Sequence, residues 1–388
     1  MKKIGISQIG IAVPEFFISV EELSRKRKLP PEYGKKGLGV FEARIPFGIS
    51  VEDLAVQALK KIDFHDVERF YFGTESDPDA SKPIAVKVLK KIGLNLVPFQ
   101  TKFACLGGLE ALILACEYSF AHSGKPAVVL TFDRSVYSEN DPRAEITQGC
   151  AALALRVEGN PKILSLEWQN FGHYASDIDD FFVPPSSFPF PIVDGELTKP
   201  AYLECQKQAL EDWKRKNAKK LKKKNATEIF DYFVLHVPFP KMVEWAAALF
   251  WRHENEKSKE HLKLSQCLKN PSLFSEYKKD LDRVRLLPEF KKFFEEKIKP
   301  GLRYNPYVGN SYTSSIFVSL LSVLEKARKG EKIGLGGYGA GAGAICLAGE
   351  VMSDFFTTDL KKQIQKGKKL SIKEYEKWRK NLFLARVS

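Results

Sequence analysis

The sequence contains the same pattern twice, and this repetition constrains the fold more than any other feature. In the first half an extended segment ends at Cys105, an apolar helical stretch follows, and Gly124 precedes an apolar strand. In the second half an extended segment ends at Asn310, a helical stretch follows, and Gly330 precedes an apolar strand. Alternating strands and helices are typical of α/β proteins whose sheets are covered by helices. The pattern therefore predicts two related α/β halves packed about a pseudo-twofold axis.

A second pair of matching positions lies upstream of the first in each half. The apolar strand expected over 69–73 ends shortly before Glu75, and the strand expected over 229–235 ends at His236. In both halves a proline and a helix follow. A pseudo-twofold arrangement would make Glu75 and His236 equivalent and would bring both pairs to strand ends on one side of the molecule.

Cys105 is the first candidate for chemistry. It is expected at a strand-to-helix turn, and Gly107 and Gly108 after it would leave room for an acyl group. Unpaired N–H groups at a helix N-terminus favour the thiolate, which is the nucleophilic form of cysteine. A small buried cysteine is an equally good interpretation of this motif taken alone.

Each of the other three residues also has a plain structural interpretation. Glu75 suits a solvated turn, His236 a buried structural group, and Asn310 a helix N-cap. Together with a cysteine they suit thioester chemistry, because His and Asn can hold a second carbonyl oxygen. A partly buried carboxylate such as Glu75 adds a base that can take a proton from carbon.

Composition excludes several classes of protein. The six cysteines include no C-x-x-C pair, which argues against a disulfide framework and a zinc site, and no metal is expected. No window of about 18 uninterrupted apolar residues occurs, so we expect no membrane span, and a reduced cytoplasm fits best. The net charge of +13 is concentrated in basic runs at 214–224 and 359–380, interpreted mainly as solvated helical faces without a nucleic-acid groove.

Further elements follow from local patterns. We expect an irregular Phe- and Pro-rich loop over 170–200, a basic helix over 201–223, and a strand over 302–308. The glycine-rich stretch 336–343 is expected to be a turn. It is not a phosphate loop, and its glycines suit either a backbone oxyanion hole or close packing.

The chain resembles the hydroxymethylglutaryl-CoA synthases of the thiolase superfamily. The matching motifs occur in the family's order and cover most of residues 1–350: Thr74-Glu75-Ser76 with Ser81-Lys82, Ala104-Cys105-Leu106-Gly107-Gly108, Thr147-Gln148-Gly149-Cys150-Ala151-Ala152, Asp180-Phe181-Phe182, Val193-Asp194-Gly195, His236-Val237-Pro238 with Lys241-Met242, Gly309-Asn310-Ser311-Tyr312-Thr313-Ser314-Ser315, and Tyr338-Gly339-Ala340-Gly341.

The resemblance implies a duplicated α/β fold in αβαβα layers, with one half over 1–160 and the other over 161–388. The second half would carry helical insertions at 201–223 and 254–300 and a basic tail. It also implies acetyl-CoA and acetoacetyl-CoA as substrates in the mevalonate pathway to isoprenoids, no cofactor, a homodimer, and an acetoacetyl-CoA thiolase as a possible partner.

The resemblance assigns roles as well. Cys105 would carry the acetyl group, Glu75 would be the acid/base, and His236 would hold a carbonyl oxygen of the second substrate. The remaining matches imply substrate-binding residues: Asn310, Gly339, Ala340, Lys241, Thr147 and Asp180.

Some residues depart from the family pattern. Ala340 stands where serine is usual, Cys150 where a small residue is usual, and Asp-Asp-Phe-Phe replaces an aromatic-rich motif around Asp180. Three alternatives stay open: a ketoacyl synthase III-like enzyme, a β-branching synthase that acts on carrier-protein substrates, and a scaffold subunit of a thiolase complex.

Overall fold

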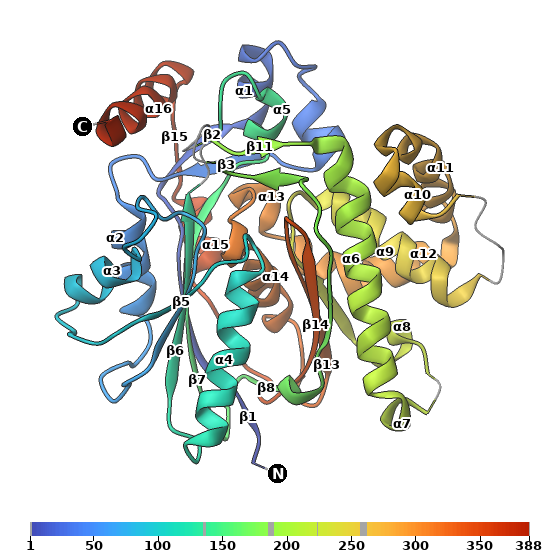
Figure 1. The fold of residues 1–388 in the computed structure, drawn as a ribbon, viewed down its shortest axis with the longest axis horizontal. Coiled ribbons are helices and arrows are strands. Elements are labelled where there is room, and N and C mark those ends of the chain that lie inside the picture. Colours follow the sequence, from blue (N-terminus) through green and yellow to red (C-terminus); the bar gives the residue numbers. More distant parts are fainter. Residues whose placement is uncertain (1, 135–136, 185–189, 223, 257–261, 388) are drawn as a thin grey trace.

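The chain folds around one large mixed sheet with two arms. The computed structural model describes residues 2–134, 137–184, 190–222, 224–256 and 262–387. Within them, ten strands form a sheet whose arms meet where β1 pairs with β8 (Figure 1). The N-terminal arm consists of β5 (Phe99–Thr101), β4 (Phe70–Gly73), β6 (Ala127–Arg134), β7 (Cys150–Gly159) and β1 (Ile4–Ala12). The C-terminal arm consists of β8 (Leu164–Leu166), β14 (Gly343–Val351), β13 (Lys332–Gly339), β12 (Tyr232–Leu235) and β9 (Gly172–Ala175).

The strand directions confirm the predicted duplication. In the N-terminal arm β4 is parallel to β6, β6 is antiparallel to β7, and β7 is antiparallel to β1. In the C-terminal arm β12, β13, β14 and β8 follow each other with the same three relations. Four strands in one half therefore have the same order and relative directions as four strands in the other half.

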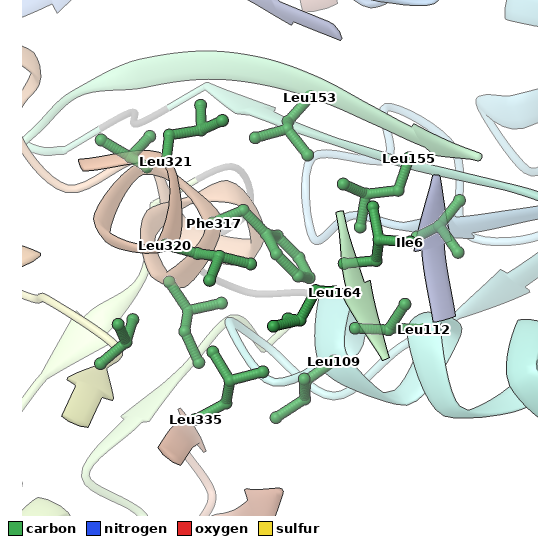
Figure 2. Packing of buried hydrophobic residues seen from close by; sticks show 14 of the residues in the cluster. Ile6, Leu109, Leu112, Leu153, Leu155, Leu164, Phe317, Leu320, Leu321 and Leu335 are labelled. Carbon is green, nitrogen blue, oxygen red and sulfur yellow. The ribbon is translucent and has the colours of Figure 1, made fainter. Parts of the chain in front are cut away.

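Two apolar helices, α4 (Gly107–Ala121) and α14 (Ser315–Leu324), form the middle layer between the arms (Figure 1). Figure 2 shows Phe317 and Leu320 of α14 facing Leu164 of β8 and Leu335 of β13. Residues 104–121 are apolar and long enough to cross a membrane, but 61% of that window is buried. Burial between the two arms accounts for this composition.

Outer helices complete the layers. The N-terminal arm is covered by α2 (Val51–Leu59) and α3 (Ala85–Lys91). The C-terminal arm is covered mainly by α6 (Gly195–Lys216) and α9 (Pro240–Asn255), with smaller helices behind them: α7 (Ala218–Leu221), α8 (Ala226–Ile229), α10 (Leu264–Lys269), α11 (Phe274–Val284) and α12 (Pro288–Phe293). The order helix, sheet, helix, sheet, helix is the thiolase-like fold that the sequence predicted.

A small three-stranded sheet closes one end of the molecule, above the sheet in Figure 1. Its neighbours are α1 at the N-terminus and α16 at the C-terminus. The elements of this region are β2 (Phe16–Ser19), β3 (Glu42–Ile45), β15 (Lys368–Lys369), α1 (Val20–Lys26), α5 (Pro142–Glu145), α15 (Leu360–Gln365), α16 (Ile372–Val387) and the short pair β10 (Phe181–Phe182) and β11 (Ile192–Val193). The division into domains at 160 stays a prediction.

The expected strand over 302–308 was wrong. A 3-10 turn over Lys299–Leu302 and the short helix α13 (Asn305–Val308) occupy this region, and each has a proline in its first turn. Proline fits the first turn of a helix and cannot donate to a strand ladder. The C-terminal arm therefore has no counterpart of β5 among the described residues.

Two other expectations need correction. The loop expected over 170–200 contains β9, which extends the C-terminal arm. Helix α6 starts within it, at Gly195, because the Asp194 carboxylate caps the first turn. Residues 185–189 of that stretch and residue 223 of the expected basic helix lie outside the described residues. The glycines from 336 to 339 lie in β13, and a Cβ at Gly337 would come within 2.8 Å of Leu106. Close packing against α4 therefore accounts for Gly337.

Candidate active site

Glu75 and Cys105 are brought together by the contact of β4 with α4. A Cβ at Gly73, the last residue of β4, would lie 2.6 Å from the Cα of Gly108 in the first turn of α4. Because the two backbones approach so closely, Glu75 just beyond the strand faces Cys105 just before the helix. The Cys105 thiol donates a hydrogen bond to Glu75 Oε1 at 3.2 Å.

The electrostatics of this pair differ from the sequence expectation. Burial, and then the negative charge of Glu75, raise the pKa of the Cys105 thiol well above its usual value. Burial and the nearby charge of Asp133 likewise raise the pKa of Glu75 well above that of an ordinary carboxyl group. This direction of the Cys105 pKa is opposite to the one expected from a helix N-terminus. The thiol donates its hydrogen bond to Glu75, which is therefore placed to receive the proton.

Asp133, at the end of β6, anchors the residues around Glu75 through hydrogen bonds. It was not among the residues predicted from the sequence. Its Oδ1 accepts hydrogen bonds from the Glu75 N–H at 2.8 Å and from the hydroxyls of Thr74 and Ser76. Its Oδ2 accepts from the backbone N–H and the hydroxyl of Thr313, in the other half of the chain. Burial raises the pKa of Asp133 to about 6. An acidic residue near the end of the largely apolar segment 127–134 was the available signal.

His236 follows β12 as predicted and is 2% exposed. Its backbone carbonyl accepts from the Tyr202 hydroxyl at 2.7 Å, and its ring lies near that of Tyr338. Burial lowers the pKa of His236 to about 3, so the imidazole is neutral. A neutral imidazole can donate one hydrogen bond to a carbonyl oxygen.

Asn310 enters the site from the C-terminal half. Its backbone N–H donates to the Thr147 carbonyl at 2.9 Å, and its Oδ1 accepts from the Tyr312 N–H at 2.9 Å. The side-chain amide nitrogen makes no hydrogen bond within the part of the chain that the structure describes. Since Oδ1 is already occupied, this nitrogen is the group that Asn310 can offer to a ligand.

One pocket contains all four residues. It has a volume of about 980 Å³ and is lined by Glu75, Cys105, His236 and Asn310. The other predicted site residues divide between its wall and its surroundings. Thr147, Lys241 and Ala340 line the pocket, whereas Gly339 and Asp180 are not among its lining residues.

Asp180 instead lies behind the wall. It is buried, its Oδ2 accepts from the Tyr338 hydroxyl at 2.8 Å, and its Oδ1 accepts from the Gly341 N–H at 2.9 Å. Burial raises the pKa of its carboxyl group. Asp180 thus anchors the β13–β14 turn that carries Ala340. Cys150 pairs with Arg134 in the sheet and is also not a lining residue.

The basic run of α6 is largely paired with acidic side chains. Lys214 contacts Glu211 and Glu254, and Lys216 contacts Asp212. Among the described residues no group of three or more His, Cys, Asp or Glu side chains could hold a metal ion. The expected absence of a cofactor stays a prediction.

Comparisons with known proteins identify the family of the chain. Residues 164–381 match the family model for the C-terminal part of hydroxymethylglutaryl-coenzyme A synthase. The hydroxymethylglutaryl-CoA synthase of Enterococcus faecalis is 29% identical over 96% of this chain and 90% of its own, and that of Haloferax volcanii is 27% identical over 89% and 84%.

Solved structures give the same result. The structure named MvaS in complex with 3-hydroxy-3-methylglutaryl coenzyme A superposes with a TM-score of 0.81 at 26% identity, over 97% of this chain and 91% of that chain. An HMG-CoA synthase complexed with CoA has a TM-score of 0.76 at 27% identity, over 97% and 90%. The chain belongs to the hydroxymethylglutaryl-CoA synthase family.

Proposed function

We propose that this protein condenses acetyl-CoA, acetoacetyl-CoA and water to 3-hydroxy-3-methylglutaryl-CoA and CoA. The observation that carries the proposal is the 3.2 Å contact between Cys105 and Glu75, in a pocket that His236 and Asn310 also line. A thiol can hold an acyl group, and a carboxylate beside it can remove a proton from that group. The pair therefore suits carbon–carbon bond formation without decarboxylation.

The first step is acetyl transfer. The sulfur of Cys105 attacks the acetyl thioester of acetyl-CoA, and the bond from the carbonyl carbon to the CoA sulfur breaks. The thiol proton passes to Glu75 and from there to the departing CoA thiolate. Glu75 is within hydrogen-bonding distance of the thiol, so this transfer needs no further group.

The second step forms the new bond. Glu75, again a carboxylate, takes a proton from the acetyl methyl group, and the resulting carbanion attacks the 3-carbonyl of acetoacetyl-CoA. Glu75 returns the proton to the new alkoxide. The neutral imidazole of His236 and the amide nitrogen of Asn310 donate hydrogen bonds to the carbonyl oxygens of this substrate.

Hydrolysis completes the reaction. Water adds to the thioester carbonyl at Cys105, the carbon–sulfur bond breaks, and the free thiol returns. The acetyl carbonyl thereby becomes the carboxylate of the product. Backbone N–H groups of Cys105 and Ala340 are proposed to stabilise the oxyanion in each acyl transfer.

The lining of the pocket suits coenzyme A. Five basic side chains are among its lining residues: Lys36, Arg143, Lys199, Lys241 and Lys278. Phosphate groups bind where cationic side chains converge. Lys241 also forms an ion pair with Glu244 at 2.7 Å, which positions its ammonium group at the start of α9.

The active unit is proposed to be a homodimer. Strand β5 is an edge of the main sheet, and apolar side chains around it and on α4 are exposed: Leu96, Val97, Phe99, Leu114 and Phe120. An exposed edge strand with apolar neighbours favours pairing with another chain. Light scattering should give twice the chain mass, and Val97→Asp should shift it toward the monomer; a monomeric wild type would contradict this part.

One assay tests the proposed reaction. Acetyl-CoA added to enzyme with acetoacetyl-CoA should cause loss of acetoacetyl-CoA absorbance and release of free CoA. The same assay with acetoacetyl-pantetheine on a carrier protein separates the two possible acceptors. Absence of condensation with acetoacetyl-CoA, with condensation on the carrier protein, would reject the CoA acceptor.

A further inference from the structure

One wall of the active-site pocket is the segment from Tyr137 to Gln148, which includes the short helix α5. Its lining residues are Tyr137, Asp141, Arg143, Ala144 and Thr147. The segment connects β6 to β7. Because it leaves the main sheet, its position depends on contacts with other elements.

The C-terminal helix α16 supplies buried contacts at both ends of this wall. Arg379 Nη1 donates to the Tyr137 carbonyl at 3.2 Å. At the other end the Tyr375 hydroxyl donates to Glu145 Oε1 at 2.8 Å and accepts from Gln148 Nε2 at 2.8 Å. Tyr375 is 1% exposed and Arg379 is 6% exposed.

A buried ionic network reinforces these bonds. The Glu145 side chain is 1% exposed, and Arg27 of the N-terminal region contacts it with two guanidinium nitrogens. This hydrogen bonding raises the pKa of Arg27 above its usual value. Arg27 also contacts Glu376 of α16 at 2.6 Å. Removing one member of such a group leaves a buried charge without its partner, so the network resists displacement.

The wall segment in turn contacts the backbone of Asn310 and holds it in place. Residues 148 and 310 form a β-bridge, and the Asn310 N–H donates to the Thr147 carbonyl. The two segments are so close that a Cβ at Gly309 would lie 1.9 Å from the Gln148 carbonyl oxygen. A shift of Gln148 must therefore move Asn310.

We infer that α16 is a positioning element of the active site, with Tyr375 and Arg379 as its positioning residues. Neither residue is among those that line the pocket. Tyr375 acts through Gln148 on Asn310. Cys105, in contrast, follows β5, and no hydrogen bond among the described residues joins α16 to β5. Since Asn310 is assigned to the second substrate, the inference rests on the proposed function and concerns the condensation step more than acetylation of Cys105.

The test is Tyr375→Phe in the full-length protein, which removes only the hydroxyl group. We expect acetylation of Cys105 within about twofold of wild type. The single-turnover rate from preformed acetyl-enzyme and acetoacetyl-CoA should fall about tenfold or more, since a displacement of about 1 Å can cost on the order of 10²-fold. The control is Trp378→Phe, which alters a neighbouring ring of α16, 5.9 Å from that of Tyr375, and should leave both rates unchanged.

A second readout does not depend on the reaction. Amide hydrogen exchange across 142–149 should be faster in Tyr375→Phe than in wild type, while the exchange of α4 is unchanged. If wild type fails to condense, the proposed function fails and exchange still tests the positioning role. If Tyr375→Phe does not fold, Arg379→Lys weakens the other end and is measured in the same way.

Three results would overturn the inference. In the first, Tyr375→Phe slows acetylation and condensation equally. In the second, it slows neither step. In the third, Trp378→Phe reproduces its effects. Each of these would show that α16 stabilises the fold without positioning Asn310.

Discussion

The Cys105 thiol donates a hydrogen bond to Glu75 at 3.2 Å, and this contact joins the proposed acyl carrier to its proposed base. It exists because β4 and α4 meet at Gly73, where a side chain would force the two elements apart. Burial raises the pKa of both groups, and their contact gives the thiol proton a direct acceptor.

Replacement of the base should separate the two half-reactions. Glu75→Gln should form acetyl-Cys105 more slowly, because it cannot take the thiol proton, but the acetyl-enzyme should still accumulate. The condensation rate of that acetyl-enzyme should fall by about 10²- to 10⁴-fold, the range for loss of a general base. The measurement is single-turnover consumption of acetoacetyl-CoA by preformed acetyl-enzyme. Glu68→Gln, an exposed glutamate before the other end of β4, is the matched control. Normal condensation by Glu75→Gln would refute the assignment.

Asp133→Asn should destabilise the fold and disturb Glu75. The carboxylate accepts from donors on both of its oxygens, whereas an amide has one acceptor oxygen. Each buried donor left unpaired costs about 1–3 kcal/mol. Urea unfolding should show this loss, and Asp53→Asn, which breaks a half-exposed pair with Lys91, should cost about 1 kcal/mol or less. Equal stability of the two variants would contradict the role given to Asp133.

The buried His236 should make stability depend on pH. Burial lowers its pKa to about 3, while the unfolded chain has a value of about 6.5. Below about pH 6.5 the unfolded state binds a proton that the native state does not, so this contribution is full above that pH and falls as pH decreases, by up to about 1.4 kcal/mol per pH unit.

Urea unfolding of wild type and His236→Gln between neutral and mildly acidic pH measures that contribution. The variant should lose less stability as pH falls, and His65→Gln, which replaces an exposed histidine, should follow wild type. Parallel curves for wild type and His236→Gln would show that this imidazole is not held neutral by the fold.

A pair of glycine substitutions tests the support of Asn310. Gly309 has a φ of +81° and no room for a Cβ beside Gln148, whereas Gly330 has a φ of +90° and nothing within 4 Å of its Cβ position. Gly330→Ala should cost about 1–2 kcal/mol, from the left-handed backbone alone. Gly309→Ala should cost more in thermal unfolding and should also weaken use of acetoacetyl-CoA. Equal costs would mean that the two segments can separate freely.

The sequence was most informative where local pattern and chemistry coincide. Hydrophobic periodicity and the positions of glycines indicate that strands end before Glu75 and His236 and that helices start after Cys105 and Asn310. The duplicated fold and the four-residue cluster could therefore be predicted. The direction in which the pKa of Cys105 is shifted could not be predicted. Proximity to a helix start is visible in sequence, but burial and a neighbouring carboxylate outweigh it in the folded protein.

Two other features depend on contacts between distant segments. Residues 302–308 have the apolar character of a strand, yet Pro306 and the packing of this region give a helix. Asp133 accepts hydrogen bonds from segments near 75 and near 313, and no local pattern reveals such partners. The same holds for Tyr375, which meets Gln148 only after the whole chain has folded.

The most direct test of the account is mass spectrometry of the protein after incubation with acetyl-CoA. Peptide mapping should find one acetyl group, on Cys105 alone among the six cysteines, and acetoacetyl-CoA should discharge it with formation of 3-hydroxy-3-methylglutaryl-CoA. No adduct, an adduct on another residue, or an acetyl-Cys105 that acetoacetyl-CoA does not consume would contradict the mechanism.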